Sequence, residues 1–271
     1  MSAQLTPWKT SRDNARMKVT AIPTFRDNYV WAIHDDQTAI LVDPGEAAPI
    51  LTWLEARDVR PIAILVTHHH ADHVGGIREI TAHQSHALPV YGPAQEPIPG
   101  RTHPLRGGET LRFAPLNLNF EVLATPGHTR GHLCYLGHGG LFCGDTLFSC
   151  GCGRLFEGTP AQMYDALGRI KALAADTRIY CAHEYTLENI AFALRVEPGN
   201  QALQQRLANV QSLRDQGLPS LPVDLGTEIA TNPFLRCEEP GVIVATAQHA
   251  KRALQPGLEA FTAVRAWRDE F

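Results

Sequence analysis

The sequence predicts an α/β fold followed by a smaller all-helical segment, and three observations support this prediction. Residues 18–185 alternate short β-branched or aliphatic runs with turns and a few helical patterns, which is typical of an α/β domain. After residue 185 the pattern is helical only. The chain has 271 residues, somewhat under two domains of about 150 residues each. We therefore expect a flexible extension at 1–17, a larger domain at 18–185 and a smaller helical domain at 186–271.

Nine segments of the larger domain have the composition of β-strands. Segment 62–66 is apolar at every position, which predicts a strand inside a sheet that is covered on both faces. Segment 116–123 alternates apolar and polar residues, so one of its faces should be buried. The expected strands are 18–22, 28–34, 38–42, 61–66, 88–91, 117–124, 132–136, 140–143 and 178–181.

Helices are predicted where apolar residues recur every three or four positions. Thr159-Pro160 is a helix start, because threonine caps the first turn and proline fits the first helical position. A Gly/Pro-rich stretch at 217–226 separates the helices of the smaller domain. The expected helices are 46–57, 77–84, 160–174, 186–196, 200–216 and 257–269.

Composition excludes several classes of protein. An apolar fraction of 44% with 19% charged residues is typical of a globular chain, not a disordered one. The balance of 24 basic and 28 acidic residues gives 24 − 28 = −4, so we expect neither nucleic acid nor a membrane as partner. No apolar run is long enough for a membrane span or a secretory signal, and we expect a cytoplasmic monomer. None of the six cysteines has CxxC spacing, which predicts reduced thiols.

Histidine is the anomalous residue. Nine of the 13 histidines fall between His68 and His132, and this clustering points to a metal site. The sequence 67–73 reads THHHADH directly after the buried strand at 61–66. In an extended loop His68 and His70 project to the same side, so both can reach one ion, whereas His69 points outward. Asp72 and His73 follow where the chain turns into a helix and could serve a second ion.

Three further candidate ligands also stand just past strand ends. They are His128, Asp145 and His183. Ligands converge outside the carboxyl ends of strands in open α/β sheets, so four strand ends can deliver their side chains to one point. His132 is interpreted as a partner of a ligand or a packed histidine. Asp43, after the strand at 38–42, is interpreted as a simple turn residue.

The charge of this ligand set predicts hydrolytic chemistry. Five neutral imidazoles and two carboxylates around two dications leave a charge of +2. Such a pair of ions lowers the pKa of bound water from 15.7 to roughly 7 and offers a Lewis acid. The set holds no thiolate, so zinc, iron and manganese all suit it. We expect two divalent ions per chain, with zinc as the first choice.

With these residues in place, the chain resembles the metallo-β-lactamase superfamily, whose H-x-H-x-D-H signature appears at 68–73. Within it the chain is similar to the glyoxalase II (hydroxyacylglutathione hydrolase) family over residues 18–271. The motifs that carry this similarity are FRDNY at 25–29, GDTLF at 144–148, GCGR at 151–154, HEYT at 183–186 and NPFLR at 232–236.

The resemblance implies an αββα sandwich followed by a helical domain. It implies one metal held by His68, His70 and His128, and another held by Asp72, His73 and His183. Asp145 and a hydroxide would bridge the two ions, and Asp72 and Asp145 would be the catalytic carboxylates. The implied reaction is hydrolysis of the thioester S-D-lactoylglutathione to D-lactate and glutathione, the second step of methylglyoxal detoxification.

The same resemblance implies four residues that bind the glutathione part of the substrate, namely Arg154, Tyr185, Arg265 and Arg268. Arginine suits a carboxylate in two-point contact. Phe156 departs from the family, which commonly has tyrosine there, so one hydroxyl contact to the substrate would be missing.

Three other functions are compatible with parts of the pattern. A persulfide dioxygenase with a single iron resembles the same scaffold, but the helical segment with Asn232-Pro233-Phe234 favours the hydrolase. A phosphodiesterase or nuclease would need a basic stripe that the sequence lacks. A non-catalytic module with 186–216 as a docking arm would not need two carboxylates that leave an open coordination site.

Overall fold

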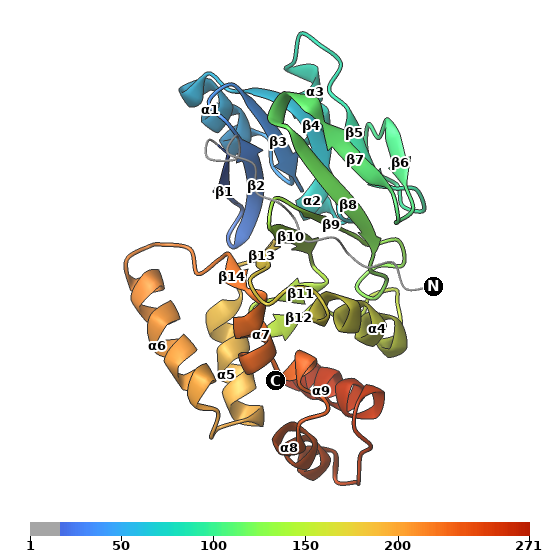
Figure 1. Cartoon of the computed structure of the whole chain (residues 1–271), viewed down its shortest axis with the longest axis vertical. Coiled ribbons are helices and arrows are strands. Elements are labelled where there is room, and N and C mark those ends of the chain that lie inside the picture. The colour runs from blue at the N-terminus through green and yellow to red at the C-terminus, as the bar shows by residue number, and fades with distance from the viewer. Residues whose placement is uncertain (1–16) are drawn as a thin grey trace.

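Two six-stranded sheets face each other, with a group of helices below the second sheet (Figure 1). This computed structural model describes residues 17–271, so the extension predicted at 1–17 lies, apart from Met17, outside the described residues. The predicted αββα sandwich with a C-terminal helical part is confirmed.

The first sheet combines an antiparallel meander with a parallel half. Its first three strands pair antiparallel, and the pairs from β3 to β6 are parallel. Helices α1 (Ala48–Arg57) and α3 (Ile77–Ala82) pack on its outer face through a cluster of buried residues that includes Trp53 and Ile80. The strands, in order across the sheet, are β1 (Lys18–Thr24), β2 (Asn28–His34), β3 (Thr38–Val42), β4 (Arg60–Leu65), β5 (Val90–Pro93) and β6 (His103–Leu105).

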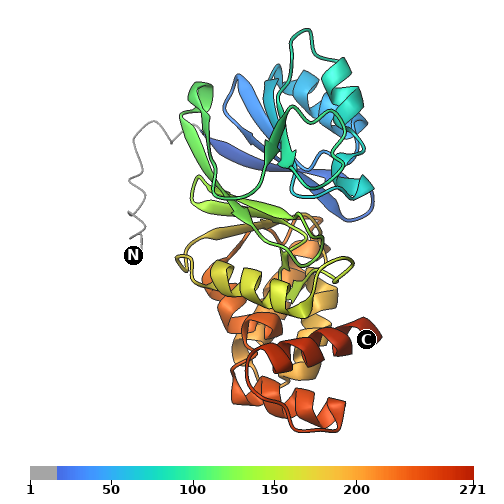
Figure 2. The ribbon, with the colours of Figure 1, turned by 90° about the vertical axis from the view of Figure 1, so that its right-hand side faces the viewer.

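The second sheet is antiparallel except where β10 and β13 run parallel. Helix α4 (Pro160–Lys171) begins after Thr159 as predicted, and the structure adds a capping box between Thr159 and Gln162. The helix lies between this sheet and α9 (Leu258–Glu270) (Figure 2). A small hairpin of β11 (Leu147–Phe148) and β12 (Gly151–Cys152) follows β10. The strands, in order across the sheet, are β14 (Val223–Asp224), β13 (Arg178–Cys181), β10 (Gly140–Gly144), β9 (Leu133–Gly137), β8 (Leu118–Ala124) and β7 (Thr110–Phe113).

Side-chain alternation in β2 explains why both faces of the first sheet are buried. Trp31 and Ile33 point into the core shared with the second sheet. Val30 and Ala32 point to the opposite face, under the outer helices. The prediction for segment 62–66 is confirmed as well, because Ala63 and Leu65 lie in the core between the sheets and Ile64 and Val66 lie in the cluster under the outer helices. Strands 28–34, 38–42 and 178–181 have the predicted bounds.

The C-terminal segment departs from the prediction in a strand and in two additional helices, α7 (Leu225–Thr231) and α8 (Pro240–Ala250). Beyond residue 185 the chain is not helical only, because β14 pairs with β13, with Asp224 opposite Arg178. Two residues are too few to show a period in the sequence, so this strand could not be predicted. Helices α2 (Ala71–Val74), α7 and α8 and the edge strands β6 and β7 were also not predicted. The helices after residue 185 are α5 (Thr186–Val196), α6 (Gln201–Asp215), α7 (Leu225–Thr231), α8 (Pro240–Ala250) and α9 (Leu258–Glu270).

Within residues 17–271 none of the helices has the length and apolar character that a bilayer crossing requires.

Candidate metal centre

Loops that leave four strands bring the seven predicted ligand residues together at one end of the sandwich. The residues that follow β4 supply His68 and His70, and the short helix α2 supplies Asp72 and His73. His128, Asp145 and His183 follow β8, β10 and β13. An isolated β-bridge between Asn28 and His183 joins the two sheets beside them.

Three imidazoles form a first triad. His70 Nδ1 lies 3.1 Å from His68 Nε2 and 3.0 Å from His128 Nε2. His68 and His128 are buried, and His70 is half-buried. The side chains of His68 and His70 therefore turn to the same side of the loop, as the alternation predicts.

Asp72, His73 and His183 form a second triad next to the first. Asp72 Oδ2 lies 3.4 Å from His73 Nε2 and 3.3 Å from His183 Nε2. The three are close because α2 turns Asp72 and His73 away from the loop that carries His68 and His70.

Asp145 lies between the two triads with one carboxylate oxygen facing each. Its Oδ2 is 3.4 Å from His128 Nε2. Its Oδ1 is 3.4 Å from His73 Nε2 and 3.5 Å from His183 Nε2. Gly144, with φ of +48°, permits this placement, because a Cβ there would lie 2.3 Å from Thr67 Oγ1.

The donor set fits divalent metal ions. His73 Nε2 and Asp145 Oδ1 are buried and have no hydrogen-bond partner, which is costly for polar atoms unless another group binds them. Ligand atoms about 2.1 Å from a tetrahedral ion lie about 3.4 Å apart, close to the spacings within both triads. His68, His70 and His128 make one such group, and Asp72, His73 and His183 another. The site is therefore suited to bind a divalent metal.

In three of the ligand histidines the ring nitrogen that faces away from the centre has an acceptor. His128 Nδ1 donates to the Arg154 carbonyl oxygen over 2.8 Å. His73 Nδ1 lies 3.0 Å from Asp43 Oδ2, and His183 Nδ1 lies 2.8 Å from Asp27 Oδ1. Such contacts fix the tautomer and leave the Nε2 lone pair directed at the centre.

Asp43 is more than the turn residue that the sequence suggested: its carbonyl oxygen does accept from the Gly45 N–H over 2.9 Å, but its side chain has a second role. Its carboxylate accepts from the Thr67 backbone N–H and from Thr67 Oγ1, each over 2.7 Å, and contacts His73. It thereby ties the end of β3 to the ligand loop after β4. Its position just past a buried strand, like those of the predicted ligands, was the signal in the sequence.

Asn28 also belongs to this site. In the sequence, the FRDNY motif that contains it indicates only family resemblance and predicts no role for Asn28. Its Nδ2 donates to Asp72 Oδ2 over 3.0 Å. It comes from the start of β2, far from Asp72 along the chain, so spacing alone could not relate the two residues.

Electrostatics keep the carboxylates in their ligating state. Burial would raise the pKa of Asp145, but the imidazoles of His73 and His183 hold it well below its usual range. Burial lowers the pKa of His68, which favours the neutral ring. For His73 burial would lower the pKa, but Asp145 and Asp43 outweigh it and raise the value.

Two more histidines surround the first triad. His132 is buried, its ring stacks on His68 with centroids 4.9 Å apart, and its Nε2 accepts from the Asp145 N–H over 3.2 Å. His69 contacts two glutamates, with Nδ1 2.9 Å from Glu96 Oε2 and Nε2 3.3 Å from Glu157 Oε1. Ligand-capable atoms of His69, His70 and Glu157 also come within 4.8 Å of one another, so the absence of a ligand role for His69 stays a prediction.

The three predicted arginines gather around Asp269 at the end of α9. Asp269 Oδ1 accepts from Arg154 Nε over 3.1 Å and from Arg265 Nη2 over 3.0 Å. Arg265 is largely buried and also donates to the Cys152 carbonyl oxygen, whereas the Arg154 side chain is 57% exposed. Arg268 lies over the Phe192 ring. Three cations against the carboxylates of Asp269 and Glu188 leave this corner with one positive charge in excess.

Two aromatic rings flank the centre. The Tyr185 ring stacks on the His183 ring with centroids 4.7 Å apart and an interplanar angle of 9°. The Phe156 ring lies 5.3 Å from His128 and 5.5 Å from His70, yet it is 61% exposed. An exposed apolar ring beside a polar centre is positioned to contact a bound molecule.

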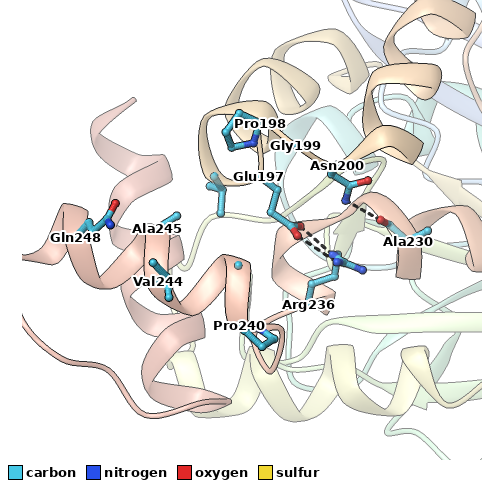
Figure 3. A pocket seen from close by; sticks show the side chains of 12 residues that line it. Glu197, Pro198, Gly199, Asn200, Ala230, Arg236, Pro240, Val244, Ala245 and Gln248 are labelled. Atoms are coloured by element: carbon cyan, nitrogen blue, oxygen red, sulfur yellow. Dashed lines mark hydrogen bonds and ion pairs between the residues drawn. The ribbon is translucent and has the colours of Figure 1, made fainter.

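A wide groove of about 780 Å³ lies elsewhere, between the end of α5 and α8 (Figure 3). Its charged residues, Glu197 and Arg236, neutralise each other in a two-point ion pair of 2.8 and 3.1 Å. Apart from this ion pair, the residues that line the groove carry no charged or metal-ligating side chain, in contrast to the metal centre.

Two family models together match the chain from residue 23 to its end. Residues 23–183 match the metallo-beta-lactamase superfamily, and residues 184–271 match the hydroxyacylglutathione hydrolase C-terminus. The junction between the two matches lies directly after His183.

Curated relatives cover nearly the full chain. A hydroxyacylglutathione hydrolase of Nitrosomonas europaea is 49% identical over 94% of this chain and 97% of its own length. One of Aeromonas hydrophila is 51% identical over 93% of this chain and 99% of its own. Among solved structures, ETHE1 from Myxococcus xanthus has a TM-score of 0.60 at 25% identity, over 93% of this chain and 99% of its own.

Proposed function

Because this chain belongs to the hydroxyacylglutathione hydrolase (glyoxalase II) family of the metallo-β-lactamase superfamily, we propose that its metal centre hydrolyses S-D-lactoylglutathione to D-lactate and glutathione. The observation that carries the proposal is Asp145, whose two oxygens face two separate triads of ligands. Among the alternatives, a single-iron dioxygenase would have no use for the second triad.

The seven side chains supply the sites for two divalent ions. His68, His70 and His128 would hold one, Asp72, His73 and His183 the other, and Asp145 would contact both. When bound, such ions supply a Lewis acid for the thioester carbonyl and lower the pKa of water to roughly 7. Zinc is the proposed metal, and iron and manganese suit the same nitrogen and oxygen ligands.

The residues of the centre fix its geometry before substrate arrives. Asp27, Asp43 and the Arg154 carbonyl group hold the ligand rings by their outward nitrogens. A preorganised site avoids reorganisation during the reaction. The leaving thiolate needs little protonation, because its parent thiol is acidic compared with an alcohol.

The positive corner at Asp269 is the proposed site for the glutathione carboxylates. Arg154 is the most accessible of its cations, and its carbonyl group contacts the ligand His128, so the peptide would lie beside the metals. Arg268 and Tyr185 would complete the contact. Arg265 would act mainly by holding Asp269 and the β11–β12 hairpin, since both of its Nη atoms are engaged. With Phe156 in place of tyrosine, the ring offers only apolar contact.

The test is a thioesterase assay on the metal-loaded protein. We expect loss of the thioester absorbance of S-D-lactoylglutathione, and we expect a chelator to abolish it until Zn²⁺ is restored. Oxygen uptake with glutathione persulfide, without thioesterase activity, would replace the hydrolase with the dioxygenase.

Replacement of Arg268 by alanine tests the substrate site. We expect KM to rise about tenfold while kcat changes less than twofold, because a contact made equally in ground and transition states affects binding alone. Initial rates over a range of thioester concentrations give both constants. Arg112→Ala, which removes an exposed arginine of β7, is the control and should leave KM unchanged. A fall in kcat with constant KM would contradict the proposed role of Arg268.

That the enzyme works as a cytoplasmic monomer, without nucleic acid or membrane partners, stays a prediction from composition.

A further inference from the structure

Glu96 is a buried carboxylate that the sequence did not single out. It lies in the turn between β5 and β6 and is only 5% exposed. Its backbone is held in place, because Arg101 Nη1 donates to the carbonyl oxygens of Glu96 and Pro93. A buried carboxylate is costly unless its oxygens are hydrogen-bonded, so its partners are informative.

The two oxygens of Glu96 bind two different ligand loops. Oε2 accepts from the His69 backbone N–H over 2.8 Å and lies 2.9 Å from His69 Nδ1. Oε1 accepts from Thr129 Oγ1 over 2.6 Å and from the Gly131 N–H over 2.9 Å. His69 separates His68 from His70, and Thr129 follows His128 directly. One carboxylate therefore joins the two loops that carry the first triad.

The second loop is shaped to admit this carboxylate. A Cβ at Gly131 would lie 2.8 Å from Glu96 Cγ and 2.9 Å from Oε1. Thr129 is fully buried with its hydroxyl directed at Oε1. The contact is thus a packed part of the fold, and no surface rearrangement would replace it.

We propose that Glu96 is a positioning residue that holds the His68–His70 loop and the His128 loop at the separation that the first triad needs to bind its metal ion. The proposal rests on the metal site of the proposed function and does not depend on the substrate. Glu96 does not contact the ion, so its effect passes through the backbone at His69 and Gly131.

The bonding pattern makes glutamine a sharp probe. Each oxygen of Glu96 accepts from a backbone N–H, and a backbone N–H cannot reverse its role. In Glu96→Gln one oxygen becomes an NH₂ group that faces an N–H, so one of the two loops loses its backbone hydrogen bond to residue 96 although the side-chain size is unchanged. An ordinary surface carboxylate would tolerate this substitution.

The experiment measures Zn²⁺ bound per chain after dialysis and Zn²⁺ affinity by competition with a chromophoric chelator. We expect Glu96→Ala and Glu96→Gln to lower the affinity for one of the two ions by about 10- to 100-fold and to leave the affinity for the other unchanged. Loss of hydrogen bonds that hold metal ligands from outside typically has an effect of this size. Both ions held with wild-type affinity in Glu96→Gln would overturn the proposal.

Asp35→Ala is the matched control. Asp35 also accepts from two backbone N–H groups, those of Gln37 and Thr38, but in the β2–β3 turn at the end of β2 away from Asn28. The Asp35→Ala variant should bind both ions with wild-type affinity. A loss of Zn²⁺ affinity equal to that of Glu96→Ala would overturn the proposal. If Glu96→Ala fails to fold, Thr129→Val is the alternative variant, because it removes only one donor to Glu96 Oε1. It should lower the affinity for the same ion that Glu96→Gln affects, and unchanged affinity would count against the proposal.

His69→Ala distinguishes the contribution of the imidazole ring from that of the backbone N–H. It keeps the His69 N–H bond to Glu96, so we expect both ions to be retained, and loss of one would show that the ring itself is needed. A wild-type protein that binds two ions without hydrolysing the thioester would refute the proposed function alone. Normal hydrolysis together with unchanged Zn²⁺ affinity in Glu96→Gln would refute the role of Glu96 alone.

Discussion

Asp145→Asn is expected to reduce kcat/KM for S-D-lactoylglutathione by at least about a thousandfold, which corresponds to about 4 kcal/mol of transition-state stabilisation. Asparagine keeps the size of the side chain but presents an NH₂ group to one of the two triads, and an NH₂ group cannot bind a cation. Because Oδ1 faces His73 and His183 and Oδ2 faces His128, either orientation of the amide removes the oxygen ligand beside one of the two triads. Zn²⁺ content should fall together with activity.

The control for this substitution is Asp165→Asn. Asp165 is exposed and pairs with Arg169 one turn along α4, so its loss should leave rate and metal content unchanged. If Asp145→Asn binds two ions per chain and keeps kcat/KM within tenfold of wild type, the proposed role of Asp145 between the two ions is contradicted.

Glu228→Ala is expected to lower the free energy of unfolding by about 3 kcal/mol, because it leaves buried donors without partners. Glu228 lies on α7 with no exposed surface. Its Oε2 accepts from the Cys150 N–H over 2.8 Å and from Asn232 Nδ2 over 3.0 Å, and its Oε1 accepts from Ser149 Oγ over 2.9 Å. It thus fastens the β11–β12 turn, where Cys150 has a φ of +57°, to the helical part of the chain. The midpoint of urea denaturation measures the loss.

Glu228→Gln should cost far less, in contrast to Glu96→Gln. The amide oxygen can take the place of Oε2, and the NH₂ group can donate to the Ser149 hydroxyl, which can accept. Burial raises the pKa of Glu228, so the charged form is less favoured here than in a free glutamate, which also eases replacement by a neutral amide. Glu55→Ala, on the exposed side of α1, should change stability by less than about 0.5 kcal/mol. Equal losses for the alanine and glutamine variants would contradict this account of Glu228.

The same hairpin explains why the cysteines at 150 and 152 are spaced so closely. Both are buried and form no disulfide, and the Cys152 carbonyl oxygen accepts from Arg265 Nη1 over 2.9 Å. The turn between them is tightly packed, since Gly151 has no room for a Cβ beside Asn189.

The local sequence determined those helices and strands that have a clear pattern of apolar residues or a recognisable start or end residue. The Thr159-Pro160 start of α4 and the apolar run of β4 are local properties of the chain, and both lie where they were predicted. The grouping of His68, His70, Asp72 and His73 could also be read locally, because four of the seven expected ligands lie within six residues. Convergence of His128, Asp145 and His183 on that loop followed from their places at strand ends.

Tertiary structure alone decided which groups stand behind those ligands and how the two parts of the chain are joined. Asp27, Asp43 and Glu96 reach their partners across distances of tens of residues or more, and no period or spacing in the sequence encodes such pairs. Strand β14 joins the second sheet through only two residues. Arg265 points inward to Cys152 and Asp269, although the sequence of the last helix is equally compatible with a solvent-exposed basic face. The physical reason is common to all of them: a buried polar group must find its hydrogen-bond partner wherever the fold brings one within 3 Å, and that partner is set by packing, not by position along the chain.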